Sequence, residues 1–97
     1  MSAPKAVSVT TNATLLIAAN GSRVYLEIVN MDAAVIFYGE DATVTVANGI
    51  QLGAAVSKSW ERTKDNSDHF YTGALYAIDA SGTSDVRVWE RLINQNG

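Results

Sequence analysis

The chain has 97 residues, of which 47% are hydrophobic and 18% are charged, a composition typical of one globular domain with a thin cover of charge. Its net charge is −3 and its seven Lys and Arg residues are scattered singly, which argues against a nucleic-acid partner because phosphate binding needs clustered positive charge. The absence of cysteine excludes disulfides, thiolate nucleophiles and cysteine-ligated zinc.

No segment predicts secretion or a membrane partner. The N-terminal residues lack the basic and apolar regions of a secretory signal, and the best apolar run, residues 14–19, is far shorter than the roughly 18 residues of a membrane span. We therefore expect a soluble protein made in a cytoplasm. The Asn-x-Ser/Thr patterns at Asn12 and Asn20 accordingly carry little weight as glycosylation sites.

The first half of the chain predicts four strands, because its apolar residues form alternating or short branched runs. After a short arm at 1–5, the expected strands are 6–11, 14–18, 23–30 and 35–39. The alternation in 23–30 is the clearest, and it places Val24, Leu26 and Ile28 inward and Arg23, Tyr25 and Glu27 outward. The Asn20-Gly21 pair predicts a type I′ hairpin turn, since both residues tolerate positive φ.

The middle of the chain is less regular. Residues 43–46 alternate and predict a further strand, closed by Asn48-Gly49. Residues 50–52 and 56–60 predict either two short strands or one strand broken at Gly53. The most polar run of the chain, 61–69, has no apolar period and predicts a loop.

The segment 73–90, GALYAIDASGTSDVRVWE, predicts a β-hairpin on which the rest of the chain is organised. Small turn-forming residues at 80–84 separate a strand at 74–79 from a strictly alternating strand at 85–90. The alternation places Val86 and Val88 inward and Asp85, Arg87 and Trp89 outward. A large aromatic side chain on a charged strand face is typical of surfaces that meet another protein.

No stretch of ten residues shows the helical period of 3.6, and Gly or Asn interrupts the chain at short intervals. The sequence predicts an all-β protein of about eight short antiparallel strands, either a β-sandwich or a small barrel. The leading architecture is a single-domain β-sandwich over 1–97, jelly-roll-like or immunoglobulin-like, with an N-terminal arm (1–5) and a C-terminal tail (92–97).

Candidate catalytic and metal-binding groups are weak. Ser67, Asp68 and His69 are consecutive, so their side chains cannot converge as a catalytic triad, and 65–68 lacks the glycine and distal glutamate of a calcium loop. Glu40 and Asp41 pair two carboxylates at a strand end, and Asp32 could lie near them if 23–30 and 35–39 make a hairpin, but adjacent acids at a turn are usually solvated. We expect no enzyme activity, no catalytic residue, no metal and no cofactor.

The aromatic residues are the best candidates for binding. Phe37, Tyr38, Phe70 and Tyr76 are assigned to the core by default, whereas Tyr25 and Trp89 are expected to face another subunit because their neighbours in the alternation are charged. The predicted protein interface comprises Tyr25, Trp60, Trp89 and Arg87. A carbohydrate site would instead be a groove lined by Trp60 and Tyr71 with polar groups beside it.

Most of the chain resembles small structural proteins of tailed bacteriophages and prophages. The resemblance is carried by SVTTNATLLIAANGSRVYLEIVN, VIFYGEDATVTVANGIQL and YTGALYAIDASGTSDVRVWE, which are patterns of strands and turns and include no catalytic signature. It implies a virion β-sandwich that decorates or cements the outer surface of the head, or else a neck, tail or fibre component. The polar loop at 61–69 is longer and more charged than this pattern leads us to expect.

The resemblance also implies the partners. They are the major capsid protein and copies of the chain itself in a homo-oligomer, with a trimer as one form, in a virion assembled in the host bacterial cytoplasm. We expect the arm at 1–5 and the tail at 92–97 to become ordered on neighbouring subunits by adding to a sheet edge. The alternative from another class is a carbohydrate-binding module that recognises a host surface.

Overall fold

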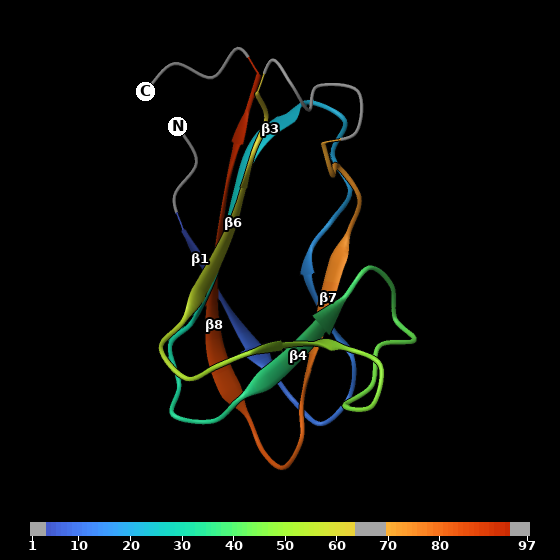
Figure 1. Ribbon diagram of the computed structural model, residues 1–97, viewed down its shortest axis with the longest axis vertical. Helices are drawn as coiled ribbons and strands as arrows, with labels where there is room; N and C mark the ends of the chain where they lie inside the picture. Colours follow the sequence, from blue (N-terminus) through green and yellow to red (C-terminus); the bar gives the residue numbers. More distant parts are fainter. Residues whose placement is uncertain (1–3, 64–69, 94–97) are drawn as a thin grey trace.

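The computed structural model describes residues 4–63 and 70–93, which form eight strands and no helix. The strands make two antiparallel four-stranded sheets that pack face to face (Figure 1). Sheet A has the order β1 (Lys5–Val9), β8 (Ser84–Leu92), β3 (Arg23–Asn30), β6 (Ser57–Glu61). Sheet B has the order β2 (Thr14–Ile17), β7 (Leu75–Asp79), β4 (Ile36–Gly39), β5 (Ile50–Leu52). The expected β-sandwich is confirmed.

The strand order identifies the sandwich as a jelly roll. The first strand pairs with the last, β1 with β8, and the same nesting continues inward as β2 with β7, β3 with β6 and β4 with β5. All connections except β4 to β5 therefore cross from one sheet to the other. This double Greek-key arrangement distinguishes the fold from an immunoglobulin sandwich.

The core lies between the two sheets and is built from alternate residues of the strands. In β3 the inward residues Leu26 and Ile28 have no exposed surface, and in β8 Val86 and Val88 are likewise buried, as the alternation predicts. The buried hydrophobic cluster consists of Val9, Leu16, Leu26, Ile28, Ile36, Tyr38, Leu52, Leu75, Ala77, Val86 and Val88. Of the four aromatic residues assigned to the core, only Tyr38 is buried; Phe37, Phe70 and Tyr76 are half-buried.

The hairpin predicted at 73–90 is wrong, because its two strands belong to different sheets. β7 pairs with β2 and β4, and β8 pairs with β1 and β3, so the connection between β7 and β8 is an arch over one end of the core. The buried carboxylate of Asp79 holds this arch: it accepts hydrogen bonds from the amides of Ser81 and Gly82 and from the Ser84 hydroxyl. These bonds hold the pKa of Asp79 below its usual value, the Ser81 amide contributing most.

The turn at Asn20-Gly21 also joins strands of different sheets and is not a type I′ hairpin. The Arg23 amide donates to the Asn20 carbonyl, and the Ser22 amide donates to the Asn20 side chain. Among the described residues, Ala55 is the only non-glycine with positive φ, 58°, so neither Asn20 nor Ser22 has the backbone that a type I′ turn requires. Local turn chemistry marked the bend correctly but not the sheet that the chain enters next.

Arg23, predicted to face outward, has no exposed surface. The pairing of β3 with β8 shifts register between Arg23 and Tyr25, and this irregularity turns the arginine inward. Its Nε donates to Glu90 Oε2 at 2.9 Å, Nη1 to the Gly73 carbonyl at 2.8 Å and Nη2 to the Ala18 carbonyl at 2.7 Å. The guanidinium thus links β3 and β8 to the two chain segments that precede β3 and β7.

Two further expectations in the middle of the chain are settled. Residues 43–46 form turns rather than a strand, because the side chains of Asp41 and Asn48 accept hydrogen bonds from the amides of Thr43 and Thr45. Residues around Gly53 form two strands: β5 belongs to sheet B, β6 belongs to sheet A, and the turn between them includes Ala55.

Candidate interaction surfaces

The outer face of sheet A carries the two aromatic residues that the alternation placed outward. In the β3–β8 register Glu27 lies opposite Trp89 and Tyr25 opposite Arg91, so Tyr25 and Trp89 are diagonal neighbours. Their ring centroids are 5.0 Å apart at an angle of 63°, an edge-to-face contact, and the Arg91 guanidinium lies 5.6 Å from the Tyr25 ring centre. Both rings are half-buried. We call the surface made by Tyr25, Glu27, Val29, Arg87, Trp89 and Arg91 the β3–β8 face.

A hollow of about 270 Å³ beside Trp89 belongs to this face. Its apolar lining includes Val29 and Met31, and Met31 is 53% exposed. Arg87 and Glu27 line it as well, and the Arg87 guanidinium makes two hydrogen bonds to the Asp85 carboxylate, which hold the pKa of Asp85 below its usual value. An apolar centre with aromatic and arginine side chains and a charged margin is the usual composition of a protein interface.

Trp60 does not belong to the β3–β8 face, so the predicted interface of Tyr25, Trp60, Trp89 and Arg87 is not one surface. It pairs with Leu26, a core residue, so its side chain is on the inner side of sheet A. There it makes an edge contact with Tyr38 of sheet B, with ring centroids 6.0 Å apart at 90°, and the Lys58 ammonium lies 5.7 Å from its ring centre. Sequence position near the end of a strand could not show which side of the sheet it occupies.

Trp60 instead lines a second hollow, of about 370 Å³, at the side of the sandwich where β5 and β6 form the sheet edges. We call this the Trp60 hollow; its lining residues are Tyr38, Gly39, Glu40, Ile50, Lys58, Trp60, Tyr71 and Leu75. The Tyr71 hydroxyl donates to the Ala74 carbonyl. Burial raises the pKa of Tyr71, and the nearby negative charge of Glu40 adds to this shift. Trp60 and Tyr71 thus line the same hollow, which is the arrangement expected for a carbohydrate site.

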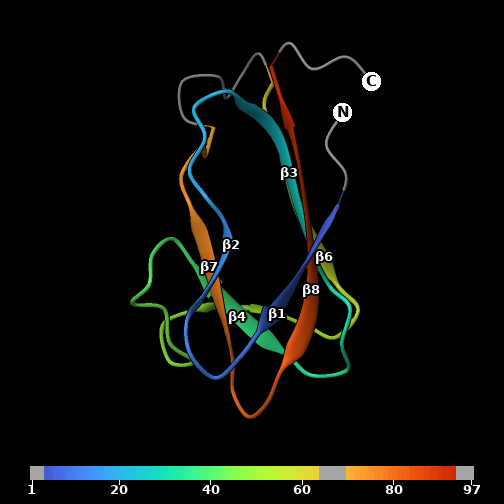
Figure 2. The same cartoon turned by 180° about the vertical axis from the view of Figure 1, so that it is seen from behind.

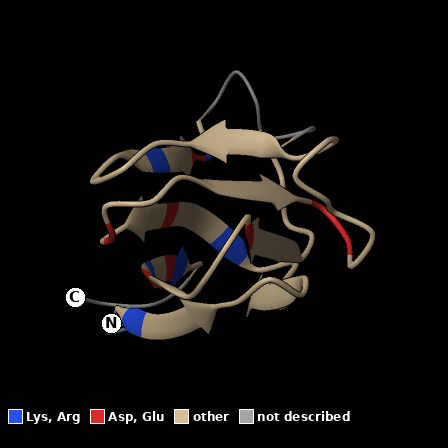
Figure 3. Ribbon diagram, turned by 90° about the horizontal axis from the view of Figure 1, so that it is seen from below, with Lys and Arg blue, Asp and Glu red and all other residues tan. Residues whose placement is uncertain are grey.

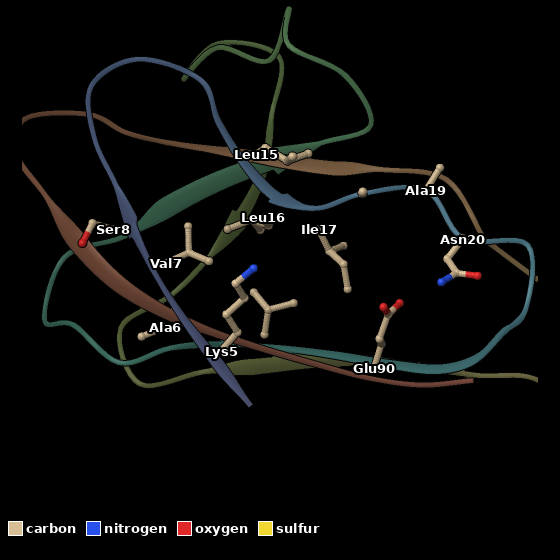
Figure 4. A pocket seen from close by; sticks show the side chains of 12 residues that line it. Lys5, Ala6, Val7, Ser8, Leu15, Leu16, Ile17, Ala19, Asn20 and Glu90 are labelled. Atoms are coloured by element: carbon tan, nitrogen blue, oxygen red, sulfur yellow. The ribbon is translucent and has the colours of Figure 1, made fainter. Parts of the chain in front are cut away.

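The opposite side of the sandwich is open between the edge strands β1 and β2. The two strands separate away from the loop that joins them, as Figure 2 shows, and leave a groove of about 620 Å³. Leu16, Ile17 and Val88 contribute apolar side chains to it. In the close view of Figure 4, Lys5 and Glu90 both rise from sheet A toward β2. Because Glu90 also binds Arg23, this groove lies beside the buried arginine that supports the fold.

Asp32 does not lie near the Glu40–Asp41 carboxylate pair. Asp32 lies before β4 and Glu40 and Asp41 after it, so they are at opposite ends of that strand. The Asp32 carboxylate accepts from the amides of Ala33 and Asp85, and hydrogen bonds from Thr43 hold the pKa of Asp41 below its usual value. The described residues contain no group of three His, Cys, Asp or Glu side chains placed to hold a metal ion. The candidates at 65–69 lie outside the described residues.

Charges on the described strands are spaced singly, with acidic residues between the basic ones (Figure 3). This distribution lacks the continuous basic stripe that a nucleic-acid backbone would contact. Within residues 4–63 and 70–93, no helix is long and apolar enough to cross a membrane.

Comparison of the chain with protein-family models, with curated proteins and with solved structures found no match. The fold and surfaces define a small jelly-roll domain with two separate aromatic surfaces: the β3–β8 face and the Trp60 hollow. A jelly roll serves many functions, so the function of this chain depends on what these surfaces contact.

Proposed function

We propose that the protein is a non-enzymatic virion component that binds the outer surface of a tailed-bacteriophage head as a decoration or cement protein. The observation that carries the proposal is the β3–β8 face, where Tyr25 and Trp89 form a half-buried aromatic pair beside an apolar hollow. The jelly roll supports it by analogy, since this architecture recurs in viral capsid domains. The resemblance of the chain to small phage structural proteins supports the same role.

The physical properties of the β3–β8 face suit repeated binding to a lattice. Two aromatic rings already in contact lose little conformational freedom on binding, and the exposed Arg91 beside them can pair with a carboxylate of a partner. One small face supplies limited affinity, but many copies on one particle gain strength if each also contacts its neighbours. The predicted partners are therefore the major capsid protein and further copies of this chain.

The sheet edges supply a second means of contact. β1 and β6 are the outer strands of sheet A, and each has one side without a neighbouring strand in the described chain. Of the segments expected to lie on neighbours, Lys5 already belongs to β1 and Leu92 to β8, because each pairs within sheet A. Residues 1–3 and 94–97 lie outside the described residues, so their addition to the edge of a neighbouring subunit stays a prediction.

The first experiment is to count copies of the protein in purified particles by quantitative mass spectrometry, with the major capsid subunit as reference. Copy numbers close to that of the capsid subunit would support a decoration role over the whole head. A few copies per particle would assign the protein to the neck, tail or fibres, and absence from the particle would refute the virion proposal.

The role of the β3–β8 face is tested by adding variants to particles that lack the protein. Trp89→Ala and Tyr25→Ala should each weaken binding by at least about tenfold, as expected for aromatic residues at the centre of an interface. Tyr76→Ala is the matched control, because Tyr76 is a half-buried tyrosine on sheet B. Equal binding by all three variants would show that the β3–β8 face does not contact the capsid.

A further inference from the structure

We propose that the Trp60 hollow binds a pyranose unit of a polysaccharide, so that the protein also has a carbohydrate-binding site. The hollow combines aromatic walls, from Trp60 and Tyr71, with the exposed charged groups of Glu40 and Lys58. This composition matches a sugar, whose ring presents apolar C–H groups on one side and hydroxyls around its rim. The inference goes beyond a decoration role and does not depend on it.

The aromatic walls are held in fixed positions. Trp60 is half-buried, and its ring stands at 90° to Tyr38, which is itself part of the core. The Tyr71 hydroxyl is tied to the Ala74 carbonyl, and its ring lies so close to Gly73 that a Cβ at this glycine would be 2.5 Å from the hydroxyl oxygen. Rings that are positioned before binding lose little entropy when a ligand stacks on them.

The polar groups favour a ligand with many hydroxyls over a simple ion. The Glu40 carboxylate can accept hydrogen bonds from hydroxyls and the Lys58 ammonium can donate to them. A ligand cation is disfavoured, because the Lys58 ammonium already lies 5.7 Å from the Trp60 ring centre and would repel it. An isolated anion would meet Glu40 on the other side, so a neutral or mixed-charge sugar fits best.

The size and position of the hollow agree with this ligand. Its volume of about 370 Å³ is near the small end of the usual range for ligand pockets, which suits one or two sugar rings better than a folded partner. It lies between the edges formed by β5 and β6, and Trp60 points to the inner side of sheet A. A copy attached to a particle through the β3–β8 face would therefore still present the hollow to solvent.

The test uses the purified full chain on an array of bacterial surface polysaccharides and their oligosaccharide fragments. The best binder is then titrated in solution against the Trp89→Phe variant, in which Trp60 is the only tryptophan. We expect saturable binding that changes the Trp60 fluorescence. An array without a binder, or a binder that leaves Trp60 fluorescence unchanged, would overturn the proposal.

Variants then locate the site. Trp60→Leu should weaken binding by at least about tenfold, because the stacking surface is lost. Glu40→Gln, a substitution at an exposed side chain that should not disturb folding, should weaken binding several-fold. Trp89→Leu is the matched control on the β3–β8 face and should bind as the parent chain does. Binding retained by both Trp60→Leu and Glu40→Gln would refute the site even if the array gives a ligand.

These outcomes are independent of particle attachment. A chain that binds sugars but is absent from virions would refute the decoration role and leave the sugar site standing. A chain that is abundant on virions but binds no sugar would support the decoration role and refute the sugar site.

Discussion

Replacing the buried Arg23 is the sharpest test of how this sandwich is held together. The Arg23→Met substitution keeps a long side chain but removes all the donors that reach Glu90, Gly73 and Ala18. The carboxylate of Glu90 then loses its ion-pair partner, and two backbone carbonyls lose their donor. Each group must be rehydrated or remain unpaired, and both alternatives lower the stability of the folded state.

The expected loss can be estimated from burial. Breaking a buried ion pair by removing one partner costs about 3–5 kcal/mol. Glu90 keeps 21% of its side chain exposed, so water can partly solvate its carboxylate and the loss should be near the lower value, about 3 kcal/mol. A chain of this size has a stability of about 5–15 kcal/mol, and each kcal/mol corresponds to a fall of about 4–8 °C in Tm.

The measurement is urea denaturation followed by tryptophan fluorescence. Arg87→Met is the matched control, since Arg87 pairs with Asp85 at the same 2.9 Å distance but both side chains are more than 40% exposed. We expect this control to leave the denaturation midpoint unchanged. Adding Glu90→Gln to Arg23→Met should recover part of the stability by removing the unpaired charge. If Arg23→Met is no less stable than Arg87→Met, the buried contacts of Arg23 do not stabilise the fold as proposed.

Three other predictions concern the turns. Hydrogen bonds depress the folded-state pKa of Asp79, so its stabilising effect is present above the unfolded value of about 3.9 and is lost as pH falls through the folded value. Asp79→Asn should thus lower the free energy of unfolding by about 1–3 kcal/mol at pH 7 and by less at about pH 3, below the unfolded value, as measured by urea denaturation at each pH; an equal loss at both would contradict this. Gly49→Ala should lower the free energy of unfolding by about 1–3 kcal/mol, because the new Cβ would lie 2.7 Å from Phe37 Cβ. Gly82→Ala is the control: its Cβ would meet open space, so this variant should be neutral or slightly stabilising. Equal Tm values for the two variants would contradict the expected clash at Gly49. Ala55→Gly should raise Tm, since Ala55 has φ of 58° and glycine adopts this conformation without strain; a lower Tm would show that chain entropy outweighs the strain.

The sequence predicted much of the local structure. Strict alternation identified β3 with its observed bounds and placed Val86, Val88 and Trp89 on the correct faces of β8. It also placed Tyr25 and Trp89 each on the outward face of its own strand, and the β3–β8 register then brings the two rings into contact. Alternation succeeds in these places because the side-chain period of two is a property of each strand by itself.

Pairing between strands could not be predicted in this way. Asn20-Gly21 and the turn after Asp79 mark bends, but the same residues can join partners in one sheet or carry the chain across the core to the other. The strand predicted at 43–46 was wrong for a related reason. The side chains of Asp41 and Asn48 accept hydrogen bonds from the amides of Thr43 and Thr45 and so stabilise turns that alternation does not detect.

By itself, the sequence determined an all-β chain of about eight short strands, the face occupied by most strand residues and the position of most turns. Only the tertiary structure decided that the strands form the nested pairs of a jelly roll, that a register shift buries Arg23, and that Trp60 faces Tyr38 and not Trp89. Alternation and turn chemistry act between near neighbours in the chain. Sheet membership instead depends on packing between residues far apart, such as β1 against β8, which no local pattern records.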